Sequence, residues 1–94
     1  MTTPPDPVTA AADHLNAMGN PVRLAILCAL RDGPLTVGQL QSAAGQAQAL
    51  ISSHLKRLRN AGLVRADRSD DDARIIFYSL SDSRIVTILD ALGL

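Results

Sequence analysis

The sequence of 94 residues lacks several features that mark large classes of protein. It has a single cysteine, Cys28, which excludes an intrachain disulfide and any zinc cluster built from the cysteines of one chain. No apolar run reaches the roughly 20 residues that cross a bilayer, so no membrane partner is expected. The opening stretch, MTTPPDPVTA, contains neither the positive region nor the apolar segment of a secretory signal. We therefore expect a cytoplasmic protein.

Motifs that carry catalysis are also missing. The chain has no Gly-rich phosphate loop, no nucleophile with a plausible histidine base and no cofactor motif, so we predict neither an enzyme nor a bound cofactor. A domain of this size buries only about 60–65% of its unfolded surface, and a partner subunit would help to stabilise it. We expect residues 1–7, which include three prolines, to form a flexible N-terminal arm, and residues 8–94 to form a single domain.

Charge is distributed unevenly, although the net charge is zero. Between residues 54 and 68 a single acid, Asp67, is outnumbered by five cations, which are Lys56, Arg57, Arg59, Arg65 and Arg68. Much of the negative charge lies elsewhere, including a run of three aspartates at 70–72. Because the distribution of charge matters more than its sum, this basic stripe is compatible with binding to nucleic acid.

Hydrophobic periodicity and turn residues predict a mainly α-helical chain with the order ααααββα. Asn20 and Pro21 are typical of a helix start, and Thr36 with Gln39 forms a capping box for the third helix. We expect helices at 8–18, 22–31, after residue 36, at 47–60 and after residues 81–82, with strands at 63–68 and 74–80. The five residues between the strands predict a hairpin with a mobile tip. This order is a winged-helix unit with a helix added at each end.

The stretch 36–64 organises the rest of the chain, since it contains two short helical patterns joined by a tight turn at Ala44-Gly45. In the second pattern one side is apolar, and the other is small, polar and ends in positive charge. The apolar side comprises Ala47, Ile51, Leu55 and Leu58, and the other side comprises Ala49, Ser52, Ser53 and Lys56. Short side chains allow a core-packed helix to enter the DNA major groove and reach base edges. We therefore predict a DNA-binding helix-turn-helix.

The first and last helices carry apolar stripes that we expect to face a second subunit, with capping of the same core as the alternative. The residues predicted for this dimer interface are Leu15, Met18, Ile85, Ile88, Leu89 and Leu92. A two-fold dimer would place its two recognition helices about 34–36 Å apart, which matches a palindromic operator.

Five motifs, taken in order, resemble the ArsR/SmtB family of bacterial winged-helix repressors. They are GNPVRL from residue 19, GPLTV from residue 33, ISSHLKRLR from residue 51, AGLV from residue 61 and IFYSL from residue 76. The resemblance covers about residues 12–92. It implies a homodimer that binds double-stranded operator DNA as a repressor and, in many members, is released by an effector.

The resemblance also implies roles for single residues. Those placed at base edges are Gln48, Ala49, Ser52 and Ser53. Those placed at phosphates or at the wing are Thr36, Lys56, Arg57, Arg68 and Arg74. The helical wheel agrees for four residues of these sets but puts Arg57 at the flank, where the alternative is an ordinary solvated residue.

Two features depart from the family pattern. Ala47 stands where relatives have a capping Ser or Thr, and loss of such a cap costs about 1 kcal/mol. The aspartates at 70–72 stand at the wing tip, where we expect them to keep the tip away from phosphates. Metal ligands of the family are also missing, because the third helix has no thiol and Arg84 replaces a histidine near Asp82. We therefore predict no metal site.

Cys28 is the remaining candidate for an effector site. Cys28 resembles the second-helix cysteine of the redox- and persulfide-responsive branch, but the last helix has no partner cysteine, so we expect Cys28 to pack in the core. We expect His54 to be a hydrogen-bonded packing residue at the core edge. Alternatives to a redox-tuned or constitutive repressor are a winged-helix protein–protein interaction module and a metal-responsive repressor with an atypical site. The operator and the regulated genes do not follow from the sequence.

Overall fold

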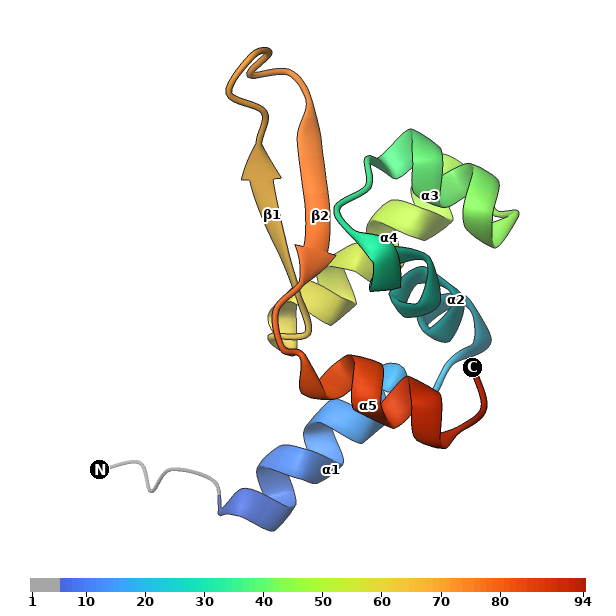
Figure 1. The fold of residues 1–94 in the computed structure, drawn as a ribbon, viewed down its shortest axis with the longest axis vertical. Coiled ribbons are helices and arrows are strands. Elements are labelled where there is room, and N and C mark those ends of the chain that lie inside the picture. Colours follow the sequence, from blue (N-terminus) through green and yellow to red (C-terminus); the bar gives the residue numbers. More distant parts are fainter. Residues whose placement is uncertain (1–5) are drawn as a thin grey trace.

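The computed structural model describes residues 6–94, and in that part of the chain the helices and strands follow the predicted order (Figure 1). The elements are α1 (Pro7–Met18), α2 (Pro21–Ala29), the short 3₁₀ turn η1 (Leu30–Asp32), α3 (Val37–Ala44), α4 (Gln48–Asn60), β1 (Val64–Arg68), β2 (Ile76–Leu80) and α5 (Arg84–Ala91). The prediction of a mainly α-helical winged-helix chain is confirmed.

Side-chain caps begin the first two helices. Asp6 accepts a hydrogen bond from the N–H of Thr9 at 2.7 Å, which lowers the pKa of the Asp6 carboxyl, and Pro7 occupies the first helical position. The side chain of Asn20 caps α2, as predicted. The expected arm at 1–7 lies mostly outside the described residues, and its last two positions belong to α1 and its cap.

Several element boundaries differ from the prediction by one or two residues. The α-helix that was expected to reach residue 31 ends at Ala29 and continues as the 3₁₀ turn. The last helix starts at Arg84, with Ser83 at its N-cap and no side-chain cap there, although Oδ1 of Asp82 accepts the Arg84 N–H at 2.8 Å. The second strand starts at Ile76 rather than at residue 74, so the hairpin tip spans residues 69–75.

The hairpin tip contains several hydrogen bonds of its own. The Ser69 hydroxyl accepts hydrogen bonds from the N–H groups of Asp71 and Asp72 at 3.2 and 3.3 Å. The Ser69 N–H donates to the Ile75 carbonyl at 2.8 Å, closing the turn at the base of the tip.

A single apolar core joins all the helices to the hairpin. Its fully buried members are Ala17, Met18, Ile26, Leu27, Leu30, Leu40, Ile51, Leu55, Leu58, Leu63, Val64, Ile85 and Leu89. Two of them come from α1 and two from α5, so the inner helices and hairpin do not close the core by themselves. The outer helices therefore cap the core of the protomer, which was the alternative to their facing a second subunit.

The arrangement separates two surfaces of the molecule. The hairpin extends from one end, α3 and α4 lie beside its base, and α5 lies across α1 at the opposite end (Figure 1). Within residues 6–94, every helix is too short or too polar to cross a membrane. The helix-turn-helix and the two outer helices are therefore presented at different ends of one small domain.

Candidate nucleic-acid interface

Local hydrogen bonds and backbone conformation determine where α3 begins and ends. The Thr36 hydroxyl accepts the Gln39 N–H at 3.2 Å and the Gln39 side chain accepts the Thr36 N–H at 2.9 Å, so the predicted capping box is present. Gly45 ends α3 in the left-handed conformation, at φ 66°, which side chains with a Cβ rarely adopt. Ala47 then occupies the N-cap of α4 and makes no side-chain hydrogen bond there, because its methyl group has no acceptor.

The two faces of α4 differ as the helical wheel predicts. Ile51, Leu55 and Leu58 are buried and anchor the helix on the core. The four residues predicted to read bases, Gln48, Ala49, Ser52 and Ser53, are all exposed on this helix. Such a helix is held rigidly by its apolar side and offers a surface of short side chains, which can approach a base edge closely.

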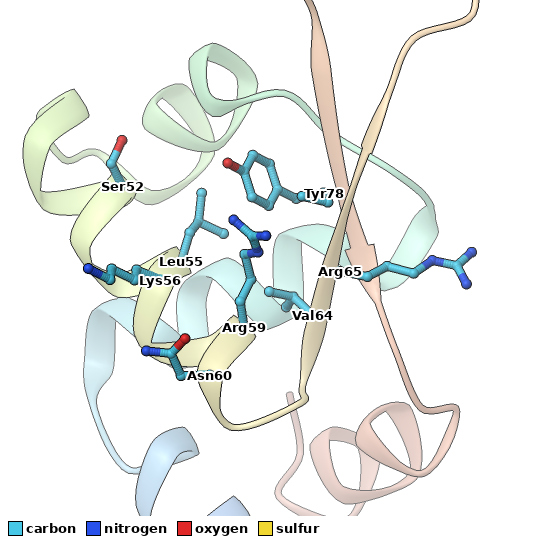
Figure 2. Close-up of a pocket in the computed structure, with 9 residues that line it drawn as sticks. Ser52, Leu55, Lys56, Arg59, Asn60, Val64, Arg65 and Tyr78 are labelled. Atoms are coloured by element: carbon cyan, nitrogen blue, oxygen red, sulfur yellow. The ribbon is translucent and has the colours of Figure 1, made fainter.

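A groove of about 580 Å³ runs between α4 and the hairpin (Figure 2). Ser52, Lys56 and Arg59 line it from the helix, and Ala66 and Tyr78 line it from paired positions of the strands. Figure 2 shows Arg59 directed from α4 toward Tyr78, whereas the side chain of Arg65 is directed away from the groove. The groove therefore combines one aromatic ring with positive charge supplied by α4.

The cations predicted at the wing have different partners. Arg68 is exposed and donates to the Ala73 carbonyl at 2.7 Å, which leaves its charge unneutralised. Arg74 instead forms an ion pair with Asp72 at 2.9 Å, and the Arg74 guanidinium lowers the pKa of the Asp72 carboxyl. Arg74 is therefore less available to a phosphate than the sequence suggests. The exposed carboxylates of Asp70 and Asp71 add negative charge at the tip.

The bacterial regulatory protein model of the arsR family matches residues 20–66, which is half of the chain. The transcriptional regulator NmtR of Mycobacterium tuberculosis is 46% identical over 79 residues, covering 84% of this chain and 63% of NmtR. The solved structure of HlyU from Vibrio cholerae is 38% identical and superimposes with a TM-score of 0.81, covering 90% of this chain and 89% of HlyU.

The chain belongs to the arsR family. Its fold is also that of a homodimeric winged helix-turn-helix DNA-binding domain from Mycobacterium bovis, which is 22% identical and has a TM-score of 0.79 over 98% of this chain and 87% of that domain. The part of this chain that matches NmtR spans just under two thirds of the length of NmtR.

A second groove, of about 480 Å³, lies between α1 and α5 of this ArsR-family chain. Leu15, His14 and Ile88 are among the residues that line it. Leu15 is 55% exposed and Leu92 is 61% exposed, so these two side chains are left uncovered by the protomer. Of the six residues predicted for a dimer interface, the three that the core buries are Met18, Ile85 and Leu89. Their burial corrects the prediction that the whole of each stripe faces outward.

The two candidate sensor residues, Asp82 and Cys28, both contact other residues of the chain. Asp82 is paired with Arg84 at 2.6 Å, and the guanidinium and N–H of Arg84 hold the pKa of Asp82 below its usual value, with a smaller contribution from His14. Within residues 6–94, no three His, Cys, Asp or Glu side chains gather as a metal would need. Cys28 is half-buried and packs against the core.

Sequence reasoning missed two functional candidates of this ArsR-family chain. Arg59 belongs to the basic stripe, but its place in the groove depends on the hairpin that closes the groove, and the wheel alone did not single it out. Arg23 is within hydrogen-bond distance of His54, at 3.2 Å between Nη1 and Nδ1. The prediction that His54 is hydrogen-bonded at the core edge is confirmed, but its partner is 31 residues away and could not be inferred.

Proposed function

We propose that this chain acts in the cytoplasm as a homodimeric transcriptional repressor that recognises a palindromic operator in a sequence-specific manner. The observation that carries the proposal is the two-faced α4 helix, whose apolar side is locked into the core while Gln48, Ala49, Ser52 and Ser53 are exposed. Membership of the arsR family and the resemblance to the regulator NmtR support the same conclusion.

In the proposed complex, α4 enters the major groove and the four exposed residues read bases. Phosphates are contacted by cations beside this helix and on the wing, which are Lys56, Arg57, Arg59 and Arg68, together with Thr36 at the start of α3. Arg74 contributes less, because Asp72 neutralises its charge. Phosphate contacts position the protein, whereas base contacts discriminate between sequences.

A homodimer completes this proposal, with the second copy seated on the groove between α1 and α5. The exposed side chains of Leu15 and Leu92 and the half-buried Ile88 offer an apolar surface there. A winged-helix relative from Mycobacterium bovis is itself described as homodimeric. An isologous dimer would present two α4 helices to successive turns of one face of DNA, as a palindrome requires.

The proposal predicts a salt-dependent complex with DNA taken from upstream of the chain's own gene, measured by fluorescence anisotropy. Each phosphate contact releases counterions, so Lys56→Gln should reduce the slope of log affinity against log salt by about one. Arg31→Gln is the matched control, since Arg31 is paired with Asp90 and the Leu94 carbonyl, away from α4, and should leave the slope unchanged. Absence of a complex at any salt would instead favour a protein–protein interaction module.

We also predict how Cys28 affects operator binding and the response to an effector. Cys28 packs half-buried against the core, so Cys28→Ser should leave operator affinity unchanged and cost about 1 kcal/mol of folding free energy. The DNA complex would be challenged with divalent metals and with a persulfide donor, before and after the substitution. Release of wild type but not of Cys28→Ser by the persulfide donor would assign Cys28 as the sensor and contradict the packing role.

A further inference from the structure

One guanidinium group joins three helices. The Nε of Arg23, in the first turn of α2, donates to the Ala17 carbonyl in the last turn of α1 at 2.5 Å. Its Nη1 lies 3.2 Å from Nδ1 of His54, in the middle of α4. The Arg23 N–H donates to the Asn20 side chain at 3.1 Å, which fixes the start of α2 from which the guanidinium extends. Arg23 therefore connects an outer helix to the recognition helix.

The contact with His54 requires one protonation state of the imidazole. A guanidinium has donors and no acceptor, and it stays charged throughout the working range of pH. Nδ1 of His54 must therefore be the acceptor, so the imidazole is neutral and carries its hydrogen on Nε2. A second proton would place an N–H donor and a positive charge against the guanidinium of Arg23, and the contact would be lost.

No carboxylate of residues 6–94 forms an ion pair with His54. Of the elements packed against α4, α3 has no charged side chain, α1 carries the exposed Asp13 and carries His14 in the groove toward α5, and α2 carries Arg23. The charged residues of β1 are Arg65, Asp67 and Arg68, all exposed, and those of α4 itself are the exposed cations Lys56, Arg57 and Arg59.

We propose that Arg23 and His54 form a pH-sensitive tie that positions the recognition helix on the corner between α1 and α2. The proposal rests on the proposed DNA-binding function. His54 directly follows Ser53 and lies two residues after Ser52, so a change in its packing is transmitted to both serines that face the bases. Arg23 and His54 act as positioning residues, and acid pH weakens operator binding by protonating the imidazole.

The test is the operator affinity of the full chain between pH 8 and pH 5.5 at constant salt. Loss of the contact in acid should lower the wild-type affinity about five- to tenfold over this interval. His54→Asn should bind at pH 8 like wild type and lose this dependence, since its Oδ1 can accept from Arg23 and does not titrate. Arg31→Gln is the control, because Arg31 lies outside both α4 and the groove between α1 and α5, and it should retain the wild-type profile. If His54 only stabilised the fold, His54→Asn would not abolish the pH dependence while leaving the affinity at pH 8 unchanged.

A second measurement tests the tie without any variant. Long-range ¹H–¹⁵N spectra of the free wild-type chain at pH 7.5 should show His54 with its hydrogen on Nε2. A hydrogen on Nδ1, or parallel pH profiles for wild type and His54→Asn, would overturn the proposal, as would wild-type affinity that rises in acid relative to His54→Asn. Failure of wild type to bind DNA at every pH would refute the proposed function instead, and the spectra would still decide whether the tie exists.

Discussion

Ile88→Asp should convert the proposed homodimer to monomers and abolish tight operator binding. Ile88 lines the groove between α1 and α5 and is half-buried within the protomer, so the partner subunit would complete its burial. A carboxylate enclosed there without a partner charge is strongly unfavourable. We expect the dissociation constant of the dimer to rise at least about 100-fold, a change of about 2.7 kcal/mol. Analytical ultracentrifugation and light scattering measure it directly.

Two further variants separate loss of the dimer from loss of the fold. Leu15 is 55% exposed in the protomer, so Leu15→Asp should spare folding and still disrupt the dimer. Thr87→Asp places the same charge on an exposed position of α5 outside the groove and should remain dimeric. A dimer that persists in both Ile88→Asp and Leu15→Asp would show that the subunits meet at another surface.

The parts of the fold that depend on neighbouring residues could be predicted from the sequence. The capping box at Thr36, the Asn20 cap and the opposite faces of α4 were all found, because each depends on residues within about one turn or on one helical period. The burial of Ile51 and the exposure of Ser52 follow from the same periodicity. These features are enough to place the helix-turn-helix and its exposed face.

Features that depend on distant residues could not be predicted in this way. Periodicity identified the apolar stripes of α1 and α5, but it did not show that the core covers Met18 and Ile85 while leaving Leu15 exposed. That division depends on how α5 crosses α1. The ion pair between Arg74 and Asp72 joins residues only two positions apart, but it depends on the hydrogen-bonded geometry of the hairpin tip, which the composition of the tip does not specify.

The double substitution Ser52→Ala and Ser53→Ala should reduce operator affinity far more than nonspecific affinity. Both hydroxyls are exposed on α4, whose opposite side is held by buried Ile51 and Leu55, so the substitutions should leave the fold intact. A good contact to a base edge contributes about 1–3 kcal/mol of discrimination. We expect the pair to lose about 2 kcal/mol on the operator, roughly thirtyfold, and less than about twofold on unrelated DNA. Anisotropy titrations on both DNAs at one salt concentration provide the comparison.

The matched control removes the same two hydroxyls elsewhere. Ser81 and Ser83 are exposed before α5, and Ser83 makes no side-chain cap there, so their double substitution with Ala should leave both affinities unchanged. Equal losses on operator and unrelated DNA for the α4 variant would mean that Ser52 and Ser53 position the protein without reading sequence. Specificity would then have to come from Gln48 and Ala49 or from the shape of the DNA, because phosphate contacts alone cannot distinguish one sequence from another.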